Sequence, residues 1–68
     1  MIAYRLLTGP DDASFCHKVT EALSKGWALY GSPCYVADPF NTGQLRCAQA
    51  VTKEVEGDYD PNVRLGSL

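Results

Sequence analysis

The chain of 68 residues is long enough for one small domain, and its 46% of hydrophobic residues is typical of a globular protein. Its formal net charge is −2 and its Lys and Arg residues are not clustered, which disfavours nucleic acid as a partner. No apolar run approaches the about 20 residues of a membrane span, and the N-terminus lacks the pattern of a signal peptide. We therefore expect a cytoplasmic protein.

The charge is unevenly distributed along the chain. Residues 1–53 carry five basic and four acidic residues, whereas residues 54–68 carry one basic and four acidic residues. We therefore predict a single α/β domain at 1–53 and an extended acidic tail at 54–68. The tail has no consistent apolar period, but it contains spaced apolar residues such as Tyr59. We expect it either to be flexible or to pack on its own domain or on a neighbour.

The first predicted element is a strand that begins at Ile2. Its side chains alternate, with Ile2, Tyr4 and Leu6 on one face and Ala3, Arg5 and Leu7 on the other. Gly9-Pro10 is expected to end this strand, because proline cannot donate to the hydrogen-bond ladder.

A helix follows over about residues 11–25. Proline suits the first turn of a helix, and Thr8, Gly9 or Asp11 is the expected cap. Lys25 and Gly26 are typical of a helix end. One apolar face recurs at helical spacing and consists of Phe15, Cys16, Val19, Ala22 and Leu23.

Two further strands are predicted. The second begins at Trp27, which is expected to anchor the core, runs to Tyr30 and is interrupted at residues 31–33. The pattern is also compatible with a resumption of the strand over residues 34–37, since a proline inside a strand pattern marks an edge or a bulge. A turn cluster occupies residues 38–43, and the third strand covers residues 44–53. In that strand Leu45, Cys47 and Val51 share one face, and Gln49 interrupts the row.

The order β-α-β-β predicts an α+β fold in which a three-stranded sheet has one helix packed on one face. The second and third strands should form an antiparallel hairpin. The first strand would run parallel to the second if the two share the sheet, and antiparallel to the third if it pairs with that strand. The sequence leaves the strand order open.

Six segments spread over nearly the whole chain carry a family resemblance, namely residues 4–12, 15–16, 26–27, 29–33, 47–51 and 57–61. Together they resemble a family of short bacterial and viral proteins that is catalogued as domain of unknown function 1737. It implies a complete stand-alone module. The family brings no established activity, so no catalytic residue is carried over.

The chain offers little for metal binding or catalysis. Cys16, Cys34 and Cys47 are 18 and 13 residues apart, without the close pairs of a structural zinc site. His17 is adjacent to Cys16, and neighbouring residues on a helix do not face each other. We expect no metal and no cofactor, and a buried thiol role for Cys16 and Cys47. If the protein were an enzyme, His17 or Cys34 would be its candidate residues.

The face of the sheet without a helix is the expected interaction surface. Depending on register, it presents Tyr4 or Arg5 together with Ala28, Tyr30, Ala48 and Ala50. An exposed apolar face of this kind marks an interface, so we predict a homo-oligomer, most simply a two-fold dimer. The candidate ligand or interface residues are Tyr4, Arg5, Tyr30, Ser32, Tyr35, Arg46 and Tyr59.

Three functions are compatible with these residues. The first is a non-catalytic binding module for a copy of itself or another protein. The second is a binder of a small, nucleotide-like ligand between subunits, favoured by the aromatic residues, by Arg5, Arg46 and Lys53, and by the viral members that the resemblance implies. The third is a small thiol-dependent enzyme.

Overall fold

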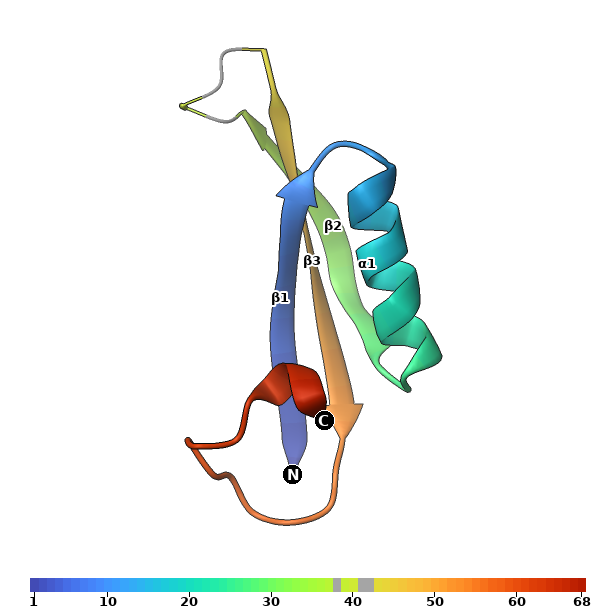
Figure 1. Ribbon diagram of the computed structural model, residues 1–68, viewed down its shortest axis with the longest axis vertical. Coiled ribbons are helices and arrows are strands. Elements are labelled where there is room, and N and C mark those ends of the chain that lie inside the picture. The colour runs from blue at the N-terminus through green and yellow to red at the C-terminus, as the bar shows by residue number, and fades with distance from the viewer. Residues whose placement is uncertain (38, 41–42) are drawn as a thin grey trace.

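The computed structural model describes residues 1–37, 39–40 and 43–68. Within these residues a three-stranded sheet has one α-helix beside it, and Figure 1 shows their arrangement. The elements are β1 (Ile2–Pro10), α1 (Ala13–Ser24), β2 (Ala28–Ala37), β3 (Leu45–Glu54) and a short 3-10 helix, η1 (Leu65–Ser67). This architecture confirms the predicted α+β fold. In the predicted turn at residues 38–43, Asp38, Asn41 and Thr42 lie outside the described residues.

The sheet has the order β1-β3-β2, so the last strand lies between the other two. β2 and β3 pair antiparallel, as the predicted hairpin requires, and β1 also pairs antiparallel with β3. The β1–β3 register runs without a break from Ile2 opposite Glu54 to Pro10 opposite Arg46. Of the two pairings left open by the sequence, the first strand therefore takes the one with the third.

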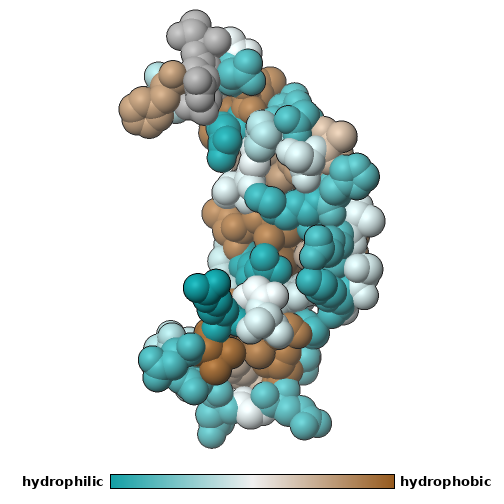
Figure 2. Space-filling view, viewed as in Figure 1, coloured by the Kyte–Doolittle hydropathy of each residue, from teal (hydrophilic) through white to brown (hydrophobic). Residues whose placement is uncertain are grey.

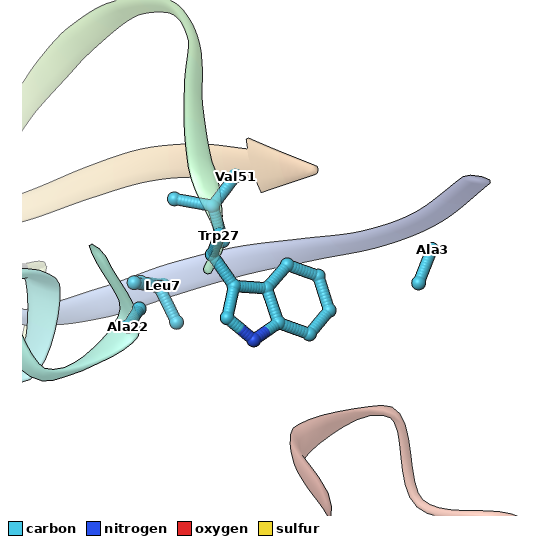
Figure 3. Packing of buried hydrophobic residues seen from close by; sticks show 5 residues of the cluster. All are labelled: Ala3, Leu7, Ala22, Trp27 and Val51. Atoms are coloured by element: carbon cyan, nitrogen blue, oxygen red, sulfur yellow. The ribbon is translucent and has the colours of Figure 1, made fainter. Parts of the chain in front are cut away.

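Helix α1 packs on one face of the sheet and leaves the other face open (Figure 1). The core lies on the helix side of the sheet and contains Ala3, Leu7, Ala22, Trp27 and Val51. Figure 3 shows the indole of Trp27 extending from Leu7 and Ala22 toward Ala3. Trp27 is 3% exposed and Val51 is fully buried, so Trp27 anchors the core as predicted.

The start of the helix differs from the prediction. β1 continues through Gly9 and Pro10, and α1 begins only at Ala13. Pro10 is tolerated because β1 is an edge strand, where a missing N–H costs no ladder bond on the solvent side. The N-cap is Asp12, whose carboxylate accepts a hydrogen bond of 2.9 Å from the Ser14 N–H. The expected caps Thr8, Gly9 and Asp11 are therefore wrong.

The helix ends as predicted. Lys25 is the C-cap, and its N–H donates to the carbonyl groups of Glu21 and Ala22. Gly26 follows with a φ of +95°, a conformation that a residue with a side chain adopts only with strain. This turn directs the chain back toward the sheet and places Trp27 beneath the helix.

The interruption of the second strand is a bulge within one continuous strand. Tyr30 lies opposite Ala50 and Cys34 lies opposite Ala48, so β2 accommodates two extra residues here. β2 is also an edge strand. Pro33 therefore lies in a bulge of an edge strand, which confirms both of the positions predicted for a proline within a strand pattern. The side chain of Gln49 is buried beneath the bulge, and its Nε2 donates to the Tyr30 carbonyl at 3.2 Å.

The segment after β3 folds back onto the helix side of the sheet. Val55, Leu65 and Leu68 pack against the core, and the Lys53 ammonium donates to the main-chain oxygen of Leu68. The Val55 N–H donates to the Met1 carbonyl at 2.9 Å. In Figure 1 the two ends of the chain lie close together at one end of the sheet. Packing of this tail on a neighbouring molecule stays a prediction.

The surface combines a polar helix with apolar patches. Figure 2 shows mainly hydrophilic and intermediate residues over the helix, whereas hydrophobic residues reach the surface along the sheet and near the lower end. Within the described ranges, no helix has both the length and the apolar character to cross a membrane.

Candidate functional site

The candidate site is the sheet face opposite α1, here called the open face. Strict alternation along β1 and β3 places every second side chain on it. The open face comprises Ile2, Tyr4, Leu6 and Thr8 of β1, Arg46, Ala48, Ala50, Thr52 and Glu54 of β3, and Ala28, Tyr30, Cys34 and Val36 of β2. The predicted set of Tyr4, Ala28, Tyr30, Ala48 and Ala50 therefore shares one face.

The open face has small residues along its centre and larger ones at its edges. Ala50 on the central strand lies between Leu6 of β1 and Tyr30 of β2. Leu6 is 54% exposed and Tyr30 is 63% exposed, although both belong to strands of the sheet. The row therefore has a small side chain at its centre and a large, exposed apolar side chain at each edge.

Charged side chains occur only at the two ends of this face, among the residues that the structure describes. Arg46 and Glu54 are on the central strand, and both side chains are exposed. Glu54 lies 3.5 Å from the N-terminal amine of Met1, and 75% of its side chain is accessible to solvent. Between these two residues the face is uncharged.

The other candidate residues are dispersed. Ser32 is exposed in the bulge of β2, and Tyr59 is 70% exposed in the segment after β3. Arg5 is on the helix side, where its guanidinium lies 5.3 Å from the centroid of the Trp27 ring. Of the seven candidates, the structure brings only Tyr4, Tyr30 and Arg46 together on the open face.

Tyr35 belongs to a separate polar cluster on the helix side of the sheet. Its hydroxyl donates to the Asp11 carboxylate at 3.3 Å, and the Cys47 thiol lies 3.8 Å from the same oxygen. The negative charge of Asp11 raises the pKa of Tyr35, and burial, followed by Asp11, raises the pKa of Cys47. Both groups are held in their neutral forms, which is the opposite of what an activated nucleophile needs.

The cysteine and histidine candidates are not assembled into a reactive site. Cys34 is on the open face, while His17 is on the helix that covers the opposite face. Cys47 is buried as predicted, but Cys16 is exposed because the helix contacts the sheet mainly through Phe15, Val19 and Ala22. The expected burial of Cys16 is therefore wrong. The described parts of the chain contain no group of three or more His, Cys, Asp or Glu side chains that could hold a metal ion.

One concavity borders the open face. It has a volume of about 290 Å³ and is lined by Thr8, Cys34, Val36, Arg46, Cys47 and Ala48. Pockets that enclose small molecules have volumes of about 300–1,000 Å³. This concavity is thus at the small end of that range, and only an additional surface would close it around a ligand.

A protein-family model matches residues 1–54. The chain belongs to the family described as Domain of unknown function (DUF1737). The match ends at the last residue of β3, so the DUF1737 unit comprises α1 and the complete sheet. The expected extension of the resemblance through residues 57–61 lies beyond the match. No curated protein and no solved structure matches this DUF1737 chain.

Sequence reasoning missed three residues that the structure places on the open face or in the polar cluster around Tyr35. Leu6 was placed on the same strand face as Tyr4 but was not counted among the interface candidates. Glu54 was assigned to the acidic tail, but its spacing of two from Thr52 continues the face of β3. Asp11 was interpreted as a cap at the start of the helix, and only the tertiary structure brings it to Tyr35 and Cys47.

Proposed function

We propose that this DUF1737 protein is a non-catalytic interaction module that self-associates through its open face. The observation that carries the proposal is the exposure of Tyr4, Leu6 and Tyr30, which are 51%, 54% and 63% accessible on one uncovered sheet face. Large apolar side chains gathered in this way mark an interaction site. Burying these side chains against a partner would favour association by about 25 cal/mol for each Å² of apolar surface removed from water.

The small core supports the same proposal. Among the residues that the structure describes, the buried hydrophobic ones are Ala3, Leu7, Ala22, Trp27, Cys47 and Val51, and three of these six are alanine or cysteine. A domain of this length buries only about 60% of the surface of its unfolded chain. Small domains commonly compensate for a limited core by oligomerisation. Covering the open face would supply a second apolar layer to the sheet.

The chemistry of the described side chains fits a binding role in a reducing compartment. Cys16 and Cys34 are exposed free thiols, which persist in the cytoplasm and are rare in oxidising compartments. The thiol of Cys47 is held neutral beside Asp11, and Cys34 and His17 are separated by the sheet. The proposal therefore assigns no catalytic role to these residues.

Light scattering coupled to size-exclusion chromatography tests the proposal. We expect the unmodified protein to have the mass of a dimer at micromolar concentration. Ala50→Arg, which places a long charged side chain between Leu6 and Tyr30 at the centre of the open face, should give a monomer. Ala13→Arg is the matched control, because Ala13 is exposed on the helix and away from the open face. A monomeric unmodified protein would refute the proposal, and Tyr30→Ser provides a milder second variant.

The concavity beside Arg46 supports a second candidate function, the binding of a small nucleotide-like ligand between subunits. Its lining contains one cation, Arg46, among mostly apolar or small side chains, and a second copy on the open face would complete its walls. A thermal-shift screen with cyclic nucleotides tests this function. A ligand at 100 times its dissociation constant should stabilise the protein by about 2.7 kcal/mol, and absence of any shift would argue against it.

A further inference from the structure

We infer that two copies pack open face to open face with their β3 strands antiparallel, so that Arg46 of each copy faces Glu54 of the partner subunit. The inference rests on the proposed self-association and specifies the orientation of the partner. It is derived from the positions of the two charges on an otherwise uncharged face.

The two charges are placed symmetrically about the centre of the face. Arg46 and Glu54 are each four residues from Ala50 on the same strand and the same side. At about 3.3 Å per residue, each charge is about 13 Å from the centre. Ala48 and Thr52 occupy the positions between, so nothing charged lies closer to the middle.

A two-fold dimer uses the same patch on both subunits. When two sheets pack face to face, the two-fold axis lies in the plane between them, either along the strands or across them. An axis along the strands would place Arg46 opposite Arg46 of the partner subunit, and Glu54 opposite Glu54 of the partner subunit. An axis across the strands at the level of Ala50 reverses one strand against the other and places each Arg46 over a Glu54.

The electrostatic contrast between these arrangements selects the second. The first creates two contacts between like charges, and the second creates two contacts between opposite charges. Like charges placed opposite each other at an interface are a recognised source of specificity against a wrong partner orientation. The accessible Glu54 carboxylate can approach an arginine while it remains near the Met1 amine.

The size of the face suits a small dimer. β1 has 9 residues and β3 has 10, so the strands span about 30 Å and three strands span about 14 Å. The projected area is then about 420 Å² for each copy, and a side-chain surface exceeds its projection. The dimer would therefore bury about 1,000 Å² in total, the size at which specific interfaces begin.

The apolar residues are compatible with this orientation. The axis passes at the level of the row formed by Leu6, Ala50 and Tyr30. Each of these residues therefore lies opposite the same residue of the partner subunit. The small Ala50 side chains allow the two central strands to approach closely, while Leu6 and Tyr30 enclose them from both edges.

Charge reversal tests the orientation. We expect Arg46→Glu and Glu54→Arg each to weaken the dimer by about tenfold at low salt, since each single variant places two pairs of like charges in contact. The double variant Arg46→Glu/Glu54→Arg should restore the affinity to within about threefold. The measurement is the dimer dissociation constant from sedimentation equilibrium, with Arg64→Glu as a charge-reversal control away from the open face.

The alternative outcomes are separable. If the two-fold axis instead runs along the strands, each charged residue faces the same residue of the partner subunit. Each variant then still pairs like charges, so neither the single variants nor the double variant would change the affinity. That result would overturn the orientation and leave the proposed self-association intact. An unmodified protein that is monomeric throughout would overturn both. Mixing the two single variants should yield a heterodimer tighter than either homodimer in both arrangements, so this control shows only that both variants are folded and associate through the open face.

Discussion

The guanidinium of Arg5 lies 5.3 Å from the centroid of the Trp27 ring, and the ammonium of Lys53 lies 5.9 Å from it. The buried indole thus has two cations near its ring, one from β1 and one from β3. A Cβ added to Gly66 would lie 3.6 Å from the Arg5 guanidinium, so the tail passes directly over this group. Trp27 therefore links the sheet, the helix and the tail on the side opposite the proposed interface.

Substitution of Trp27 should show that the packing of its ring contributes more to the stability of the fold than its N–H group does. The indole Nε1 is buried and has no acceptor within the described part of the chain, so its loss leaves no group newly unpaired. We expect Trp27→Phe to be the milder change and Trp27→Ala to reduce the free energy of unfolding by about 3–5 kcal/mol. Urea denaturation followed by circular dichroism measures both, and equal losses for the two variants would contradict this account.

The tail should stabilise the fold without taking part in assembly. Leu65 and Leu68 pack against the core on the helix side. Removal of residues 65–68 should lower the melting temperature and expose Trp27, with a red shift of its fluorescence. Because the open face is on the other side of the sheet, the dimer dissociation constant should change little at temperatures where the variant is folded. A variant that is folded but monomeric would place the tail in the interface.

The cluster of Asp11, Tyr35 and Cys47 predicts a loss of stability at alkaline pH. The pKa values of Tyr35 and Cys47 are raised in the folded state, so the unfolded chain releases these protons at lower pH than the folded one does. The contribution of these two groups to the free energy of unfolding is complete below the ordinary thiol pKa of about 8.5. It declines as the pH rises through the pKa values that the groups have in the folded state. Asp11→Asn removes the negative charge that lies beside both Tyr35 and Cys47.

Urea denaturation between pH 7.5 and pH 10.5 measures this effect. The unmodified protein should lose stability steadily over that range, and Asp11→Asn should show a shallower decline. Asp12→Asn is a useful control, since Asp12 caps the helix and its pKa is lowered by hydrogen bonds from Ser14. The Asp12 carboxyl group affects stability only at acidic pH. The decline of stability between pH 7.5 and pH 10.5 should therefore be the same in Asp12→Asn as in the unmodified protein. Identical alkaline slopes for the unmodified protein and Asp11→Asn would refute the proposed coupling.

Much of the fold could be predicted because local patterns determine it. Alternation placed Tyr4 and Leu6 on one face of β1, and the helical period identified the buried side of α1. Gly26 and Pro33 marked a helix end and an edge strand for stereochemical reasons. The pairing of β1 with β3 was left open, because alternation defines the faces of a strand and not its neighbour.

The candidate site was only partly predictable for the same reason. Tyr4, Tyr30 and Arg46 meet on the open face through the register of the sheet, which no local pattern specifies. Arg5 was a candidate because the sequence did not decide which face of β1 the helix covers. Gly9 and Pro10 suggested a strand end, but Gly9 continues β1 beneath Phe15, whose ring would crowd a larger residue there.

Sedimentation equilibrium of the unmodified protein over about 1–100 µM tests the central claim most directly. The chain has a mass of 7.4 kDa, and the account predicts a concentration-dependent shift toward twice that mass, abolished by Ala50→Arg and retained by Ala13→Arg. A single species with the mass of the monomer at every concentration would contradict the claim that the open face is an interface.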